Sequence, residues 1–372
     1  MNIRFATDDD IPAVARFNQR LRAGGREEQI TLYPSLPGEA KYRPEGFPVY
    51  RQMAIAEDGE EVRAAVLLYH NNVFIRGKKQ NFCWLDMPIS EGIIDRRHSL
   101  AIVQLIKAVS KYEPFLMSTG AGPEDKAAFQ LLTKIGWRHH AVPFFFYPVK
   151  VARVLLGMSY FEKHAGLRYG ALLGAYSGLG AGLSGLLTLR RRITASLSGY
   201  ERSVAEAFDG WADRIFEACL PDYGVAMRSD ATTLNILHPP NKTGLTRLRA
   251  RRKGAKRDAG WILVASKQMK NNHYFGDLKV GTLVDGFGSA ADAPALVAAG
   301  INYLAETEVD IIVANFSHSA WVEACRQSGM IAGPDNYYHF VSPGGSPLFE
   351  DTCPPREIHM ARGHSGGIWS LV

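Results

Sequence analysis

The pattern of hydrophobic and polar positions predicts two successive series of strands and helices. Alternating or solidly apolar segments indicate strands, "YRQMAIAED" and "VRAAVLLYH" in the first series and "TRLRAR" and "GWILVASK" in the second. Turn-prone sequence joins each pair, "EDGEE" in one and "RKGAKRDAG" in the other. Each series then continues as strand, helix, strand, helix, strand. This order predicts an α/β fold (α+β type) with a mixed, mostly antiparallel sheet flanked by helices in each half.

The two series also resemble each other in sequence. "NNVFIRGKKQNFCWLDMPIS", from Asn71, aligns with "NNHYFGDLKVGTLVDGFGS", from Asn271, and this places Asp86 opposite Asp285. Further on, "AAFQLLTKIGWRHHAVPFFFYPVK" matches "SAWVEACRQSGMIAGPDNYYHFVSP". The glycines in this second block, at 136 and 329, are typical of helix C-terminal caps. Two blocks in the same order and at nearly equal offset favour an internal duplication over chance similarity.

The length of 372 residues fits two domains and a connector. We expect a first domain at 1–150, an apolar helical connector at 151–200 and a second domain with a C-terminal tail at 201–372. The connector holds an uncharged run at 169–189, followed by three arginines at 190–192. The run is long enough for a bilayer span, but its six glycines argue against one. A helical hairpin, packed between domains or against a membrane face with the arginines near anionic headgroups, fits better.

Composition narrows the classes of partner. The net charge of +6 suits an anionic partner such as a phosphate, a CoA or an acidic bilayer. The basic run "TRLRARRKGAKR", at 246–257, lacks the interleaved aromatic residues of nucleic-acid binders, so solvated charge or headgroup attraction is favoured over nucleic acid. The N-terminus does not look like a secretory signal. The cysteines lie far apart and indicate neither a zinc site nor a disulfide framework, so we expect no metal and a cytoplasmic location: Cys83, Cys219, Cys325 and Cys353.

The stretch "IDRRHSLAIVQLIKAV", at 94–109, places positive charge and a small residue where an apolar helix begins. Helix starts usually favour acidic residues, and a helix N-terminus offers unpaired N–H groups to an anion. Arginines add bidentate contacts to phosphate. The pattern predicts a diphosphate site at Arg96, Arg97, His98, Ser99, Leu100 and Ala101. The alternative is a solvated first turn without a ligand.

These segments resemble the GNAT superfamily of acyl-CoA-dependent N-acyltransferases, in its tandem form. "IRFATDDDIPAVARFNQRL" is similar to the family's opening strand and helix, and "RRHSLA" to its pyrophosphate-binding signature. "DKAAFQLLTKIGW" is similar to the late helix that frames the arm of the acyl carrier. The resemblance covers 1–150 well and 220–345 more faintly. It implies two GNAT-like domains and acyl-CoA as the donor substrate.

The chain departs from the family pattern at three places. Ser99 stands where the signature has glycine, and Leu132 stands where many members carry a tyrosine that acts as general acid. In the second copy "SAADAPALVAAG" carries no arginine where the signature should lie. We therefore expect the first domain to hold the acyl-CoA.

Attack of an amine on a thioester needs a base for the amine proton. The candidates are Asp86, at the end of the strand before the signature, then Glu91, and His98, which could also donate to a phosphate. Asp86 could instead cap a turn, because Pro88 follows it. Cys83 is expected in the core.

The expected activity is transfer of an acyl group from a CoA thioester to a primary amine of an amphiphilic acceptor. The acceptor is either a long-chain sphingoid-type lipid amine, as in ceramide formation, or an amino sugar of a glycan precursor. A lipid acceptor would go with peripheral membrane contact through 169–192. Two alternatives stay open: a catalytically silent scaffold or ligand sensor with the same fold, and an aminoacyl-tRNA-dependent transferase.

Overall fold

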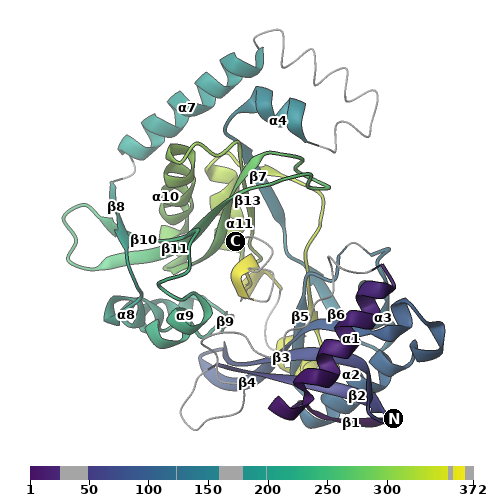
Figure 1. The fold of residues 1–372 in the computed structure, drawn as a ribbon. Coiled ribbons are helices and arrows are strands. Elements are labelled where there is room, and N and C mark those ends of the chain that lie inside the picture. The colour runs from purple at the N-terminus through teal and green to yellow at the C-terminus, as the bar shows by residue number, and fades with distance from the viewer. Residues whose placement is uncertain (26–48, 123, 159–178, 198, 351–354, 365–372) are drawn as a thin grey trace. The chain divides into compact units, whose positions relative to one another are not determined.

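The computed structural model describes residues 1–25, 49–122, 124–158, 179–197, 199–350 and 355–364 (Figure 1). The chain forms two compact units whose segments interleave along the sequence. Unit 1 comprises Met1–Ala141, Gly224–Arg228 and Tyr337–Pro354, and unit 2 comprises Val142–Tyr223, Ser229–Asn336 and Pro355–Val372. The units therefore differ from the contiguous segments 1–150, 151–200 and 201–372 that the sequence predicted.

Unit 1 is built on a mixed sheet with the strand order β1-β2-β3-β4-β5-β15-β6, and β9 pairs with the far end of β3. Only β4 and β5 pair in parallel along this order. The strands are β1 (Asn2–Phe5), β2 (Tyr50–Asp58), β3 (Glu61–Ile75), β4 (Lys78–Ser90), β5 (Leu116–Thr119), β6 (Arg138–Ala141), β9 (Val225–Met227) and β15 (Tyr338–Val341). The helices are α1 (Ile11–Ala23), α2 (Ala101–Tyr112), α3 (Ala127–Lys134) and α12 (Ser346–Glu350).

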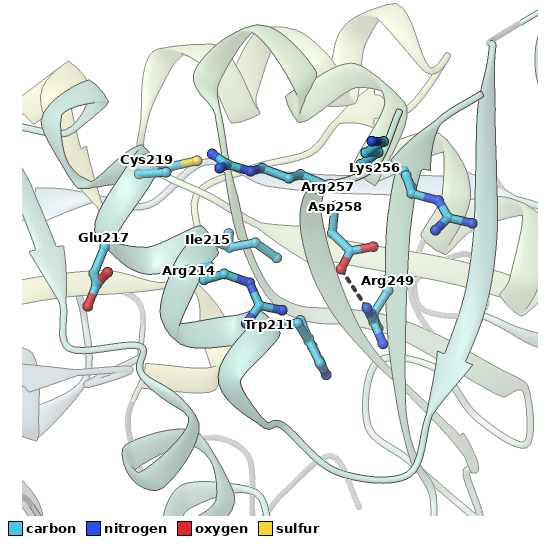
Figure 2. A pocket seen from close by; sticks show the side chains of 11 residues that line it. Trp211, Arg214, Ile215, Glu217, Cys219, Arg249, Lys256, Arg257 and Asp258 are labelled. Atoms are coloured by element: carbon cyan, nitrogen blue, oxygen red, sulfur yellow. Dashed lines mark hydrogen bonds and ion pairs between the residues drawn. The ribbon is translucent and has the colours of Figure 1, made fainter. Parts of the chain in front are cut away.

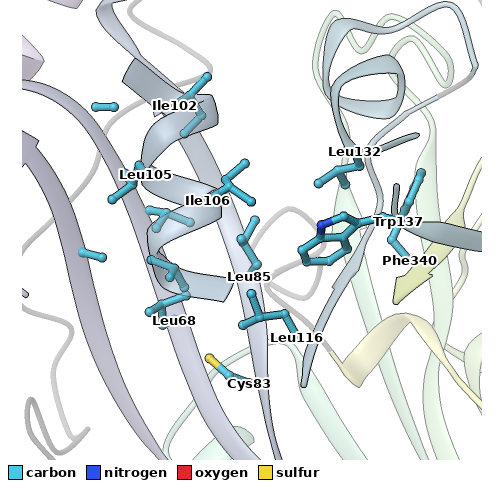
Figure 3. Packing of buried hydrophobic residues seen from close by; sticks show 14 of the residues in the cluster. Leu68, Cys83, Leu85, Ile102, Leu105, Ile106, Leu116, Leu132, Trp137 and Phe340 are labelled. Carbon is cyan, nitrogen blue, oxygen red and sulfur yellow. The ribbon is translucent and has the colours of Figure 1, made fainter. Parts of the chain in front are cut away.

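The core of unit 1 lies between α2 and the sheet. Ile102, Leu105, Ile106 and Val109 recur at helical spacing and form the buried face of α2. They pack against buried residues of β3 and β4, among them Cys83, in the cluster of Figure 3. Cys83 is fully buried, as predicted, and burial raises the pKa of its thiol. This packing fixes the place where α2 begins.

Unit 2 repeats the same architecture, with the strand order β8-β10-β11-β12-β13-β7-β14 and a parallel pair at β12 and β13. The strands are β7 (Phe144–Pro148), β8 (Tyr200–Ala205), β10 (Leu245–Arg252), β11 (Asp258–Gln268), β12 (Lys279–Gly288), β13 (Ile311–Asn315), β14 (Ile331–Ala332) and β16 (Ile358–His359). The helices are α4 (Val151–Gly157), α7 (Leu179–Leu197), α8 (Gly210–Cys219), α9 (Ala231–Leu237), α10 (Ala293–Glu306) and α11 (Ser319–Gln327).

The two sheets exchange one strand each. β7 follows the strands of unit 1 in sequence but pairs with β13, and β15 follows those of unit 2 but pairs with β5 and β6. The pairs Val313↔Phe146 and Phe340↔Ser118 lie at the centres of these ladders. Each aromatic strand thus occupies the same position in the other copy's sheet. This reciprocal exchange is why the compact units interleave.

The predicted helix caps are confirmed in both copies. Gly136 and Gly329 have φ of 89° and 80°, the left-handed region that glycine adopts at low cost. The Trp137 N–H donates to the Leu132 carbonyl after α3, and the Met330 N–H donates to the Cys325 carbonyl after α11, each at 3.0 Å. The alignment of Asn71 with Asn271 is wrong in detail, because Asn71 lies inside β3 and Asn271 follows the end of β11.

Part of the predicted connector forms α7. The Ser184 hydroxyl accepts from the Val151 N–H at the start of α4, at 2.9 Å. Residues 169–178 of the apolar run lie outside the described residues. Within the part of the chain that the structure describes, no helix combines the length and apolar character of a bilayer span.

Candidate functional site

The parallel strands at the centre of unit 1 diverge at one point. The β4–β5 ladder ends at the pair Trp84↔Met117, and Asp86 is the second residue beyond it on β4. The next residue, Met87, has φ of 47°, and the β3–β4 register shifts opposite this place. The Met87 N–H donates to Asp86 Oδ1 at 3.0 Å. The bulge therefore lies just beyond the point where β4 and β5 stop pairing, and Asp86 is part of it.

Asp86 is half-buried, and its surroundings affect its acidity. Burial raises the pKa of the Asp86 carboxyl, while the Met87 N–H and the Arg51 charge oppose the shift without reversing it. A carboxyl with a raised pKa holds a proton more readily than an ordinary aspartate, which suits a group that exchanges protons with a ligand.

Glu91 has a different environment. Arg20 Nε and Arg63 Nη1 each donate to one of its oxygens at 2.5 Å, and the Glu91 side chain is 5% exposed. Burial alone would raise its pKa, but the two arginines outweigh burial and lower it. These contacts favour an ion-pair role that holds the loop after β4 to α1 and β3.

The loop between β4 and α2 is held by hydrogen bonds between its own residues. Ser90 Oγ donates to the His98 carbonyl at 2.9 Å and accepts from the Gly92 N–H at 2.9 Å. A Cβ at Gly92 would lie 2.5 Å from Ser99 Cα, so only glycine allows this approach. The loop thereby sets the start of α2 against the end of β4.

The N-terminus of α2 carries no side-chain cap. The helix begins at Ala101, and the capping residue Leu100 makes no side-chain hydrogen bond to it. Asp95 instead caps the preceding 3-10 turn, Arg96–His98, by accepting from the Arg97 N–H at 3.0 Å, and also pairs with the Arg97 side chain. Helix N-terminal N–H groups without a cap attract anions.

The predicted phosphate ligands differ in their contacts. The Arg96 side chain is exposed and has no hydrogen-bond or ion-pair partner among the described residues. Arg97 is bound by Asp95 at 2.6 Å. His98 Nε2 lies 3.9 Å from the same aspartate, and the main chain of His98 is held by Ser90. Ser99 and Leu100 are exposed, but the Ser99 N–H already donates to the Arg96 carbonyl at 3.1 Å and Ala101 is buried. The arrangement leaves the Arg96 side chain as the most accessible donor.

The 3-10 turn before the equivalent helix of unit 2, α10, is capped by side-chain oxygen atoms. Asp222 Oδ2 accepts from the Ala290 N–H at 2.8 Å, and Ser289 Oγ accepts from the Ala291 N–H at 3.3 Å. Asp292 in the same turn, Ala290–Asp292, binds the Arg252 guanidinium. These contacts cap the turn and not α10, which begins at Ala293 without a side-chain cap, as α2 does at Ala101.

The gap between the diverging strands of unit 2 is also filled. The β12–β13 ladder ends at Leu283↔Ala314, and residues 358–364 of the C-terminal segment lie against both strands. Phe316, just beyond β13, forms a β-bridge with Ala361. On the β12 side, His359 Nε2 donates to the Gly286 carbonyl at 2.8 Å, and a Cβ at Gly363 would touch Val284 and Asp285. Among the described residues, no such bridge joins β4 and β5 in unit 1.

Asp285 occupies in β12 the place that Asp86 occupies in β4, with the same contact from the next N–H, here Gly286 at 2.8 Å. It forms a buried cluster with His359 and His364. His364 Nδ1 accepts from the Ala361 N–H at 3.1 Å, so its Nε2 carries the proton and points at Asp285 Oδ2, 3.1 Å away. His359 Nε2 also carries its proton, toward Gly286. Both ring nitrogens that face Asp285 are donors, which favours hydrogen bonding over metal ligation.

The sequence indicated Asp86, its mate Asp285 and the loop 96–101, but it did not indicate the C-terminal segment at 358–364. Two histidines in "HMARGH", at 359 and 364, were the available signal. Their spacing does not link them to Asp285, because they contact it only once the C-terminal segment has packed against β12.

Comparison with known proteins adds a fold-level likeness. No protein-family model and no curated protein matches the sequence. A probable N-acyltransferase of Enterococcus faecalis V583, a conserved protein of unknown function, superposes with a TM-score of 0.52 at 7% identity, over 95% of this chain and 75% of that one. A tandem GNAT protein from the clavulanic acid biosynthesis pathway gives 0.48 at 11%, over 92% and 98%. The N-myristoyltransferase of Saccharomyces cerevisiae with bound myristoyl-CoA gives 0.45 at 9%, over 78% and 69%.

These identities are low, so the likeness concerns the fold. Together with the repeated order of strands in the two sheets, it confirms the predicted α/β fold, with two mixed sheets flanked by helices.

Proposed function

We propose that the chain is an acyl-CoA-dependent N-acyltransferase whose donor binds unit 1. One observation carries the proposal: among the described residues no β-bridge joins the diverging strands β4 and β5, whereas the C-terminal segment fills the equivalent place in unit 2. Since the two copies share one fold, the open copy is the one that can accept a ligand in this position.

The residues of unit 1 fit the phosphates of a CoA thioester. The diphosphate would lie at the positive end of the helix beside Ser99 and Leu100, which are exposed, and Arg96 would add a charge-assisted hydrogen bond. Arg97 and His98, which both lie beside Asp95, would add positive potential near the diphosphate without binding it directly. Ser99 is larger than the glycine of the family signature. It is exposed to solvent, so its side chain is not packed inside unit 1.

The proposed reaction joins the amine nitrogen of the acceptor to the acyl carbon and breaks the carbon–sulfur bond. The amine must lose a proton, and the departing CoA thiolate must gain one. Asp86 is our candidate for the base, because it lies just beyond the end of the β4–β5 ladder and its raised pKa brings it closer to that of an amine. Glu91 and His98 remain second candidates, and the two ion pairs of Glu91 would have to loosen first.

The direct test is release of free CoA thiol from acyl-CoAs of rising chain length with a panel of primary amines. We expect turnover with at least one pair, and Arg96→Ala should raise the KM for acyl-CoA by about tenfold, the value of one charged hydrogen bond. Arg326→Gln, an exposed arginine of α11, is the matched control. No thiol release with any pair, together with no binding of acyl-CoA, would exclude the enzymatic proposal.

The acceptor is proposed to be an amphiphilic amine, and a lipid amine has one structural argument in its favour. Leu183, Leu186 and Leu189 lie along one side of α7 and are 47%, 63% and 57% exposed. Such a row can enter a bilayer surface, with the arginines that follow in sequence near anionic headgroups. An amino sugar of a glycan precursor is the alternative acceptor and needs no membrane contact.

Flotation with anionic vesicles tests this part. Wild type should float, and Leu186→Gln with Leu189→Gln should not. Leu156→Gln, which changes an exposed leucine of α4, should float like wild type. Equal flotation of all three would remove the argument for a lipid acceptor.

The thiol-release and binding assays also distinguish an acyl-CoA-dependent transferase from two other functions. A silent scaffold or ligand sensor, suggested by Ser99 and Leu132 at signature positions, would bind a ligand without releasing thiol. An aminoacyl-tRNA-dependent transferase would lose activity on treatment with ribonuclease, whereas transfer from acyl-CoA would not.

A further inference from the structure

A cavity of about 480 Å³ lies in unit 2 between α8 and the β10–β11 hairpin. Figure 2 shows cationic side chains entering it from both walls. Its lining contains five cationic and two acidic side chains, with Trp211 and Ile215 among the apolar contacts. The volume falls in the range of small-ligand sites.

The acidic residues leave most of this positive charge uncompensated. Asp258 is bound by Arg249 Nη2 at 2.6 Å, and Arg251 reaches Glu201 at 3.4 Å. Arg214, Lys256 and Arg257 have no hydrogen-bond or ion-pair partner among the described residues.

One arginine is already fixed in place at the cavity wall. The Arg249 guanidinium lies 4.7 Å from the centre of the Trp211 ring, and Asp258 holds its other side. Its Nε is buried and has no hydrogen-bond partner among the described residues. A buried donor without an acceptor is costly unless a water or a ligand supplies one.

We infer that this cavity binds a phosphate-bearing ligand, either a phosphomonoester or a diphosphate. Phosphate oxygens match the planar donor groups of arginine, and a dianion compensates more of the cavity's charge than a single carboxylate does. The side chains of Arg214, Lys256 and Arg257 and the fixed guanidinium of Arg249 can contact such a group from α8 and from the hairpin. The ligand could be a soluble phosphorylated molecule or the headgroup of a phospholipid, since the recognised chemistry is the same.

The inference concerns a place separate in sequence and fold from the proposed donor site at 96–101 of unit 1. Because that site is also proposed to bind a diphosphate, the experiment must distinguish the two. We therefore use variants of Arg96 for the donor site and of Arg214 and Arg257 for the cavity. If one of the two sites does not bind pyrophosphate, the other can still be tested.

The experiment is calorimetric titration of the full chain with inorganic pyrophosphate at fixed ionic strength. We expect saturable binding that Arg96→Ala retains and that Arg214→Ala with Arg257→Ala weakens by about tenfold or more. Arg326→Gln removes one positive charge elsewhere on unit 2 and should bind like wild type. Circular dichroism and thermal unfolding establish that the variants remain folded.

The source of the phosphate is then decided with vesicles. Sedimentation with phosphatidic acid in phosphatidylcholine, lost in the Arg214→Ala and Arg257→Ala variant, would support a headgroup. Pyrophosphate binding without sedimentation would support a soluble ligand. Pyrophosphate heat that is unchanged in this variant, or no saturable heat at all, would overturn the inference. Binding of a short RNA without saturable pyrophosphate heat would overturn it in favour of a polymer.

Discussion

Asp86 and Asp285 occupy equivalent places in the two copies, and their neighbours move their acidities in opposite directions. At Asp86 burial prevails and raises the pKa. At Asp285 burial would do the same, but the neighbouring rings of His364 and His359 outweigh it and lower the pKa. A duplicated aspartate has thus become a candidate base in one unit and a structural anion in the other.

The role of Asp86 can be tested by Asp86→Asn. Loss of a general base typically lowers kcat by about a hundredfold or more, while the KM for acyl-CoA should hardly change. Because the pKa of Asp86 is raised, the wild-type rate should increase with pH through a value above the ordinary range of a carboxyl, and this limb should vanish in the variant. Asp125→Asn, an exposed aspartate of unit 1, is the control. An unchanged pH profile would remove Asp86 as the base.

His318 gives a prediction on stability. Burial, reinforced by the nearby His359, lowers the pKa of His318 to about 4. Between this value and about 6.5, the value for an unfolded chain, the unfolded state holds one proton more, so stability is lost as pH falls through this window. His318→Asn keeps an oxygen to cap α11, where the imidazole now accepts from the Ala320 N–H.

This variant should reduce the dependence of the free energy of unfolding on pH by about 1.4 kcal/mol per pH unit between pH 6 and 5. Urea unfolding at pH 7, 6 and 5 measures the slope. A variant with the wild-type slope would show that His318 is not titrating in this range.

The sequence predicted some of these residues and missed their partners. Aligning the copies identified Asp86 and Asp285 correctly, because a strand repeat preserves position. The ion pairs of Glu91 with Arg20 and Arg63 could not be read from the sequence, because they join residues far apart along the chain.

At the scale of elements, the loop after β4 decides where α2 presents its N-terminus. Gly92→Ala places a Cβ against Ser99 Cα, and the loop must shift to relieve the contact. We expect weaker binding of acyl-CoA, by about tenfold, with the change measured by calorimetry. Gly182→Ala, in α7 where a Cβ has open space, should bind acyl-CoA like wild type. Equal affinities in the two variants would mean that the loop does not shape the donor site.

Elements with strong local signals were predicted well. The hairpins, the buried face of α2 and the glycine caps of α3 and α11 follow from periodicity and backbone preference. The C-terminal segment at 358–364 has no comparable signal, because its place depends on filling the gap between β12 and β13.

At the scale of the whole molecule, the exchange of β7 and β15 makes each sheet depend on the other half of the chain. The aromatic segments were predicted as strands, but a local pattern does not say which sheet a strand joins. Both copies carry an aromatic strand at the same spacing. The sequence pattern is therefore equally consistent with each strand joining the sheet of its own copy or that of the other.

Splitting the chain tests this dependence. A fragment of 1–158 lacks β15, so β5 and β6 lose the strand that joins them, and we expect no cooperative thermal unfolding from it alone. Mixed with a fragment of 179–372, it should regain a single cooperative transition, because each supplies the missing strand. Cooperative unfolding of the first fragment by itself would show that β15 is dispensable.

The exchange also has a consequence during biosynthesis. The first sheet cannot close until β15 has left the ribosome, although its other paired strands emerge much earlier. At typical rates of translation the nascent chain would expose the open edges of β5 and β6 for on the order of ten seconds or more. We therefore expect chaperones that prevent aggregation to bind the nascent chain. The yield of folded protein should fall when translation is slowed between the two halves.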